Sequence, residues 1–302
     1  MHQEKDNWDL VIQGKTSLFD LRLKEVWRYR DLLLMFVKRD FITVYKQTIL
    51  GPLWFFIQPI LTTLTFMVIF GGLAKIPTDG APKLVFYMSG ITIWNYFSNC
   101  LTDVSKVFLS NSAIFGKVYF PRLIMPLTIV ISNLMKFAVQ FVMFVGFVIY
   151  FYSQGEINPN LWMLFLPIIL LIMALIAMGI GLILSSMTTK YRDLTMLIAF
   201  GVQLFMYATP VIYPISVVPV KYLWIIKLNP LVPIFDYTRY AFLGIGDFNI
   251  VALVYPVLFI FCSDISNRCY HFQQSAKIFY GYCLIFFIKY NPRQNKDKSN
   301  LS

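Results

Sequence analysis

Hydrophobic residues along the chain gather in long runs that approach the length of a membrane-spanning helix. About 20 apolar residues in a helix cross the hydrocarbon core of a bilayer. Five runs come near that length, at residues 50–74, 84–101, 123–152, 161–187 and 194–220, and a sixth begins near residue 250. The pattern therefore predicts an all-α membrane protein, with most of the chain in lipid.

The segment ahead of the first run, residues 28–48, is basic and amphipathic. We expect a helix that lies at an anionic headgroup surface and turns into the bilayer at Gly51-Pro52. Its apolar side chains, which would dip beneath the headgroups, are Leu32, Leu33, Phe36 and Val37. Its cations, which would attract the headgroups, are Arg28, Arg30, Lys38, Arg39 and Lys46.

Residues 214–249, beyond the fifth run, alternate prolines with apolar and aromatic residues. The segment is too apolar for a solvated loop, and its prolines break it too often for one helix. We expect short helices that dip into the outer leaflet. Irregular backbone at membrane depth is tolerated where protein or a water-filled cavity surrounds it, so the segment is expected to cap a pathway. A plain interfacial cap without a gating role is the alternative.

Composition supports a membrane protein, because 58% of the 302 residues are hydrophobic, 14% are charged and the mean hydropathy is +0.65. Soluble domains carry about 25% charged residues. The net charge is +11, which would fit a nucleic-acid partner in a soluble protein. In a membrane protein, however, positive residues collect on the cytoplasmic side, so no nucleic-acid partner is expected.

The charges between the runs predict the orientation of the chain. Residues 1–49 hold nine Lys or Arg, residues 105–122 hold three and residues 188–193 hold two, whereas residues 153–160 hold none. The positive segments should therefore be cytoplasmic. The first 25 residues have no central apolar run, so no cleavable signal peptide is expected and the N-terminus should stay in the cytoplasm.

The sequence motifs of common catalytic and cofactor sites are missing. There is no GxxxxGK[ST] loop for nucleotide phosphates and no GxSxG, HExxH or CxxC. The four cysteines have neither metal-ligand spacing nor the pattern of a disulfide scaffold. We expect no catalytic residue, metal or cofactor in this chain.

Several polar residues interrupt the apolar runs, and ionisable groups at membrane depth are costly and often functional. Lys136 is the most informative, about 15 Å along a helix from Pro126. Either it serves transport, or it snorkels or pairs with a neighbouring helix. The other interruptions are Gln58, Asn95, Asn99, Asp103, Asn133, Gln140 and Gln203.

Aromatic residues make up 18% of the chain and recur inside the runs. Lipid-facing packing and interfacial belts explain many such residues. The alternative is that some line a conduit, where aromatic faces would offer a sugar chain weakly selective contacts. The candidates for that lining are Trp54, Phe56, Trp94, Phe97, Tyr207 and Tyr213.

The cytoplasmic loop at residues 105–122 is short, basic and rich in apolar residues. So many apolar side chains are unfavourable in water, so we expect the loop to be a docking surface for a soluble partner. A simple connector is the alternative. The apolar residues concerned are Phe108, Ile114, Phe115, Val118, Tyr119 and Phe120.

Four passages within residues 28–246 resemble the membrane subunit of ABC-2-type exporters for bacterial cell-surface polysaccharide, such as O-antigen or teichoic acid. They read RDFITVYKQTILGPLWFFIQPIL, GKVYFPRLIMP, YRDLTMLIAFGVQLFMYATPVIYP and LNPLVPIFDYTRYAFLG. The resemblance implies six spans, a homodimeric core in the inner membrane and two copies of a separate ABC ATPase. Undecaprenyl-diphosphate-linked glycan would move outward through a central channel.

The same resemblance implies roles for particular segments. Residues 1–48 form the cytoplasmic N-terminus with the interface helix at 24–46, residues 49–262 form the transmembrane domain, and residues 214–246 form outer gate helices. The loop at 107–122 couples to the ATPase, through Phe115, Lys117, Val118, Tyr119, Phe120, Pro121 and Arg122. An ABC-2 exporter of a drug or simple lipid is the alternative. A membrane-embedded transferase would need an acidic or histidine cluster at the interface, which the sequence lacks.

The C-terminus departs from the family pattern. The sixth run, residues 250–262, is too short to cross a bilayer and a polar stretch follows it. Reading the possible codons of residues 269–285 one nucleotide later permits VIIFNKVQKSFMDTV, which resembles the family's tail. We hypothesise a frameshift near residues 257–268, so that residues 263–302 are out of frame; a divergent but genuine tail is the alternative. Resequencing the 3′ end tests this, and the present frame shared by related strains would exclude it.

Overall fold

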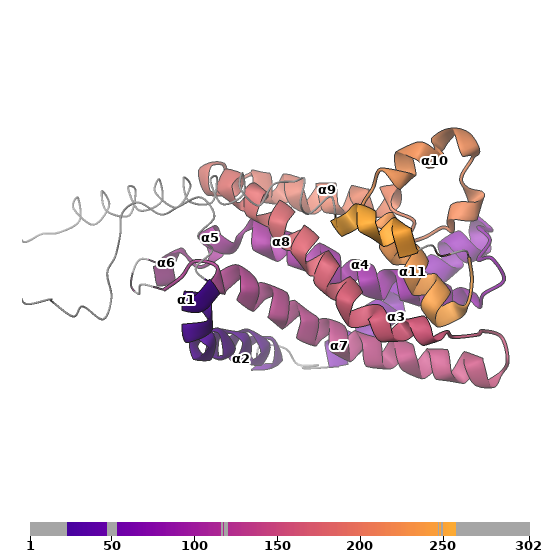
Figure 1. The fold of residues 1–302 in the computed structure, drawn as a ribbon, viewed down its shortest axis with the longest axis horizontal. Coiled ribbons are helices and arrows are strands. Elements are labelled where there is room, and N and C mark those ends of the chain that lie inside the picture. The colour runs from indigo at the N-terminus through magenta and orange to yellow at the C-terminus, as the bar shows by residue number, and fades with distance from the viewer. Residues whose placement is uncertain are drawn as a thin grey trace, which may run out of the picture.

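The computed structural model describes residues 23–46, 53–115, 117, 120–246, 248 and 250–257. All regular structure in these ranges is helical. The long helices run side by side along the longest axis, with short helices gathered at both ends (Figure 1). This arrangement confirms the predicted all-α membrane protein. The proposed out-of-frame tail and most of the sixth run lie outside the described residues, so the count of six spans stays a prediction.

The first five apolar runs each form a helix. They are α3 (Trp54–Phe66) with its π-helical continuation η2 (Met67–Leu73), α4 (Lys83–Ser105), α7 (Ile124–Ser153), η3 with α8 (Leu161–Phe165, Leu166–Lys190) and α9 (Leu194–Ala208). Three of the described helices are both long and apolar enough to cross a membrane: α3 with η2, α7, and η3 with α8. Helix α4 has the length, but its sequence is more polar.

Helix α4 is central to the fold and packs against α3, α7, α8, α9 and α11. It approaches α8 closely, since a Cβ added to Gly181 would lie 2.8 Å from the Val104 side chain. Next to it, the Thr188 hydroxyl donates to the Ser105 carbonyl at 2.6 Å. Small residues at four-residue spacing on α8 therefore permit close packing, as small residues do between membrane helices.

The fifth helix is shorter than its apolar run predicted. Helix α9 ends at Ala208 because Pro210 and Pro214 follow and cannot continue a helix. The chain then forms η4 (Ile215–Val217), α10 (Val220–Lys227) and α11 (Val232–Leu243). The short helices predicted for this segment are thus confirmed. Helix α11 is largely buried, whereas α10 has no buried residue. Helix α10 lies at the edge of the molecule (Figure 1).

The opposite end of the molecule gathers α1 (Leu23–Arg28), α2 (Arg30–Lys46), α5 (Val107–Ser110) and α6 (Ser112–Phe115) around the start of α7 (Figure 1). Segments that lie about 80 residues apart in the chain therefore meet. Hydrophobic residues of α1 and α2 pack on a small core formed by the loop after α4 and the first turn of α7. We call this region the collar end.

Candidate functional site

Aromatic rings join the interface helix to the loop at the collar end. The Phe36 ring of α2 lies 5.9 Å from that of Phe120, which stacks on Phe115 at 5.4 Å; Phe115 in turn lies 5.6 Å from Phe108. Aromatic pairs at such distances contribute about 0.5–1.5 kcal/mol each beyond their buried area. Helix α2 and the predicted coupling loop are therefore parts of one packed unit.

The apolar face of α2 packs on the rest of the protein. Leu32, Leu33 and Phe36 pack on the small core at the collar end, and Val37 is 5% exposed. These side chains cover the loop and the start of α7, and their position beneath the headgroups stays a prediction. Among the side chains of α1 and α2 that the structure describes, the exposed apolar ones include Trp27, Leu34, Met35 and Ile42.

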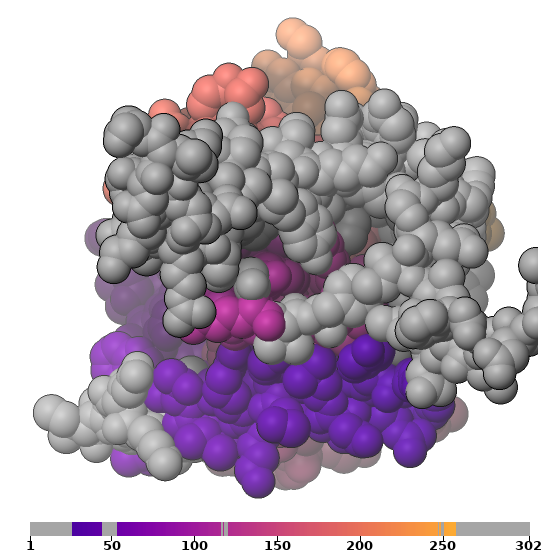
Figure 2. All heavy atoms as spheres, turned by 90° about the vertical axis from the view of Figure 1, so that its left-hand side faces the viewer, coloured from indigo at the N-terminus to yellow at the C-terminus, as the bar shows by residue number. Residues whose placement is uncertain are grey.

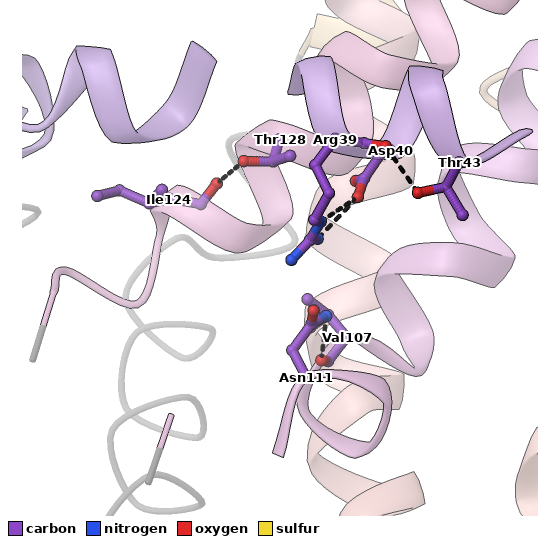
Figure 3. A network of polar contacts seen from close by, with 7 residues as sticks. All are labelled: Arg39, Asp40, Thr43, Val107, Asn111, Ile124 and Thr128. Atoms are coloured by element: carbon purple, nitrogen blue, oxygen red, sulfur yellow. Dashed lines mark hydrogen bonds and ion pairs between the residues drawn. The ribbon is translucent and has the colours of Figure 1, made fainter. Parts of the chain in front are cut away.

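The cations predicted to attract a headgroup are of two kinds. Arg39 forms an ion pair with Asp40 at 2.7 Å, lies 4.8 Å over the Phe36 ring and extends toward the turn that carries Asn111 (Figure 3). Both partners belong to α2, so these contacts lie within the helix. Arg28 and Lys38 are exposed. Arg30 lies 3.8 Å from Asp31, with both side chains largely exposed, and the side chain of Lys46 is outside the described part.

The predicted coupling loop presents a small polar tip. Phe120 is buried and Phe115 half-buried in the aromatic cluster, and Pro121 and Arg122 are half-buried, while Ser112, Ala113 and Lys117 are exposed. Figure 2 shows this end of the molecule, where α1 and α2 form a band beside the loop. Four of the six apolar residues that argued for a docking partner are thus used in internal packing, namely Phe108, Ile114, Phe115 and Phe120. Val118 and Tyr119 lie outside the described residues.

Lys136 belongs to a polar network between α4 and α7. Its ammonium donates to the Asn133 Oδ1 atom at 2.9 Å, and the Asn133 amide donates to Asp103 at 3.2 Å. Asp103 also pairs with Lys106 at 2.9 Å. Lys136 bonds directly to a residue of its own helix and reaches α4 only through Asn133, so the choice between a transport role and helix pairing stays a prediction. The network compensates the Asp103 carboxylate by two positive side chains, one of them through Asn133.

The six aromatic residues predicted to line a channel do not form one surface. Trp94 and Phe97 are buried, with centroids 6.1 and 6.4 Å from Phe205 of α9. Trp54 and Tyr207 are exposed on different helices, α3 and α9, and Phe56 and Tyr213 are half-buried. Their part in transport stays a prediction, and the structure gives two of them a packing role.

Arg239 of α11 is not among the functional residues predicted from the sequence. It is 5% exposed, donates to the carbonyls of Val211 and Tyr213 at 3.0 Å each, and lies 4.1 Å over the Phe86 ring. Burial lowers the pKa of the guanidinium to about 10, so it stays cationic at neutral pH. Arg239 thus fastens the chain beyond α9 between α11 and α4.

Within the stretches that the structure describes, no group of three or more His, Cys, Asp or Glu side chains could hold a metal ion. Three other features of the described structure could serve function. They are the collar end, the α4/α7 network and the arginine-fastened outer segment.

Comparison with known proteins fits this arrangement. A family model described as ABC-2 type transporter matches residues 31–243, from α2 to the end of α11. An O-antigen export system permease protein RfbA of Klebsiella pneumoniae is 28% identical over 232 residues, 76% of this chain and 87% of the relative. The protein of that name from Myxococcus xanthus is 27% identical over 199 residues, 65% of this chain and 73% of the relative.

A further relative is the inner membrane transport permease YadH of Escherichia coli (strain K12), which is 23% identical over 269 residues, 86% of this chain and 97% of the relative. The family match covers more than half of the chain and includes the four passages quoted above, apart from the last residue of the fourth, Gly244. The chain belongs to the ABC-2 type transporter family and is a membrane-embedded protein.

Proposed function

We propose that this chain is the membrane subunit of an ATP-driven exporter that moves undecaprenyl-diphosphate-linked polysaccharide of the O-antigen kind outward across the inner membrane. The similarity to O-antigen export permeases over most of the chain carries the proposal. The sequence lacks a nucleotide-phosphate loop, so ATP hydrolysis is assigned to a separate ABC ATPase. Two copies of each subunit form the working transporter.

The two ends of the molecule support this assignment. The collar end has an exposed polar tip on a rigid base, as a docking loop requires, with an amphipathic helix packed beside it. The other end has short helices that close over the span bundle. With the N-terminus in the cytoplasm, the docking loop faces the ATPase and the short helices face outward.

The proposal predicts the effect of deleting the gene. Surface polysaccharide should be lost, and lipid-linked glycan should accumulate at the cytoplasmic side of the inner membrane, because the step that moves it outward is missing. Immunoblotting of surface glycan and mass spectrometry of the lipid fraction measure the two quantities, and a plasmid copy should restore both. Normal surface polysaccharide in the deletion strain would contradict the proposal, and a change in drug tolerance alone would favour the drug-exporter alternative.

The docking loop gives a second prediction. Lys117 is exposed at the polar tip, so reversing its charge should weaken the ATPase complex without unfolding the membrane subunit. We expect Lys117→Glu to lower co-purification of the ATPase about tenfold, equivalent to about 1.4 kcal/mol of binding energy. Lys221→Glu, exposed on α10 at the other end, is the matched control and should leave it unchanged. Equal recovery of the ATPase with both variants would refute this docking site.

A further inference from the structure

Helix α4 changes character halfway along its length. Every residue from Val85 to Trp94 is buried, so this half is enclosed on all sides. From Asn95 to Lys106 one side of the helix is buried and the other is open. Every open position in that stretch is polar, namely Asn95, Ser98, Asn99, Thr102, Asp103 and Lys106. We call these six residues the polar stripe.

The polar stripe follows one side of the helix. Its members recur at three- and four-residue spacing and extend over about 17 Å of helix axis. The opposite side packs on α8 through Leu101 and Val104 and on α9 through Phe97. The stripe therefore explains why α4 is long enough to span a membrane yet less apolar than the other long helices.

The open polar groups of the stripe do not suit a lipid-facing surface. Amides and hydroxyls in hydrocarbon lose their hydrogen bonds to water, so polar residues at membrane depth face protein or a water-filled path. Asn95 and Asp103, at the border with α7, are hydrogen-bonded there to Gln140 at 3.5 Å and Asn133 at 3.2 Å. Asn99 is exposed, and Ser98 and Thr102 are half-exposed.

The chemistry of the stripe fits a hydroxyl-rich chain. Its charges are compensated, because Asp103 pairs with Lys106 at 2.9 Å. Its middle offers neutral amides and hydroxyls, which both donate and accept hydrogen bonds. Neutral groups spread along a helix form many weak and similar bonds with sugar hydroxyls, and such bonds let a chain advance without a single tight site. A fixed anion would instead require unpaired cations.

The enclosed half of α4 shows where this surface stops. A Cβ added to Gly90 would lie 2.5 Å from the Val211 carbonyl oxygen, so the chain beyond α9 presses directly on α4. Arg239 fastens that chain by its bonds to Val211 and Tyr213. The stripe is thus open toward the collar end and closed toward the outer helices.

We propose that the polar stripe of α4 lines the cytoplasmic half of the translocation path and binds the glycan chain through hydrogen bonds from its amides and hydroxyls. The inference rests on the proposed function, because the ligand is the glycan that the exporter would carry. It adds the surface that the glycan contacts.

Cysteine labelling of the full-length transporter, with its ATPase and with the four natural cysteines replaced, tests the water-filled path. A membrane-impermeant thiol reagent is applied to inverted membrane vesicles. Asn99→Cys should react at least about tenfold faster than Met135→Cys, since a thiol in apolar surroundings stays protonated and unreactive. Met135 is a matched control, because it is exposed and lies at a similar height along the neighbouring helix α7. It lies between Asn133 and Gln140 of α7, which are hydrogen-bonded to Asp103 and Asn95 of the stripe, and Asn99 lies between those two stripe residues. Equal, slow labelling of both would overturn the proposal and indicate a stripe covered by a second copy or by lipid.

Protection by substrate tests the ligand. In vesicles with an ATPase that binds but does not hydrolyse ATP, labelling of Asn99→Cys should slow several-fold in a strain that makes the lipid-linked glycan, relative to a strain that does not. Unchanged labelling would overturn the glycan assignment.

An export assay tests the hydrogen bonds of the stripe. The double variant Asn95→Leu with Asn99→Leu should lower surface glycan several-fold, while Asn95→Ser with Asn99→Ser should preserve it. Equal export by both double variants would also contradict the proposal. The first labelling test needs no substrate, so its outcome separates a failure of the stripe from a failure of the proposed function.

Discussion

Gly90→Ala is expected to destabilise the protein by about 3 kcal/mol or more, although it adds a single methyl group. The new Cβ would lie 2.5 Å from the Val211 carbonyl oxygen and 3.2 Å from the Val211 side chain. Backbone cannot move aside as a flexible side chain does, so the segment beyond α9 must shift. The carbonyl that it displaces is also an acceptor for Arg239 at 3.0 Å.

Gly146→Ala is the matched control for this prediction. Gly146 lies inside the spanning helix α7 with nothing within 4 Å of an added Cβ. The change should be neutral or stabilise by up to about 1 kcal/mol, since alanine has the higher helix propensity. Thermal unfolding in one detergent compares the two variants. Equal midpoints would show that Gly90 does not set the contact between α4 and the outer segment.

Arg239→Met should be the second severe change, with a loss of about 3–5 kcal/mol of stability. It removes the donor for two buried carbonyls, at Val211 and Tyr213, and the cation over the Phe86 ring. Arg239→Lys should recover only part of the loss, because an ammonium cannot reproduce the planar fork of a guanidinium. Limited proteolysis and thermal unfolding measure the effect. We expect faster cleavage of the outer segment and a lower unfolding temperature for Arg239→Met.

Lys221→Met is the control for Arg239, because Lys221 is an exposed cation on α10 and should change stability by less than about 0.5 kcal/mol. The double variant Gly90→Ala with Arg239→Met gives a further check. Both changes act through the Val211 carbonyl, so the double variant should lose less stability than the sum of the losses in the two single variants. Full additivity would mean that Gly90 and Arg239 act on separate parts of the protein.

Hydropathy in the sequence predicted the spans well where the apolar run and the helix share the same ends. Helix α7 covers Ile124–Ser153 against a predicted run at 123–152. Prediction was poorer at α9, since hydropathy continues to residue 220 while the helix stops at Ala208. Apolar composition does not end at a proline, whereas a helix does, so the proline pattern was the better guide to that boundary.

Residue type alone did not predict which way the side chains face. The aromatic residues Trp94 and Phe97 carry the composition of a channel lining, yet both are buried against Phe205. Phe36, Phe115 and Phe120 are residue types that are typical of a membrane-facing or docking surface, yet they pack on one another. Aromatic rings suit lipid, protein and sugar equally, so their sequence position does not choose among these partners.

The sequence by itself determined that this is an all-α membrane protein, because long apolar runs, prolines and charge asymmetry act locally along the chain. The ABC-2 kind was indicated by the resemblance of four passages to that family. Only the tertiary structure decided which polar interruptions are compensated and which are open. Lys136 is bonded to Asn133, whereas Asn99 is exposed in a stripe of α4 in which every open position is polar. The physical reason is that exposure depends on neighbouring helices far away in the chain, and hydropathy of one segment contains no information about them.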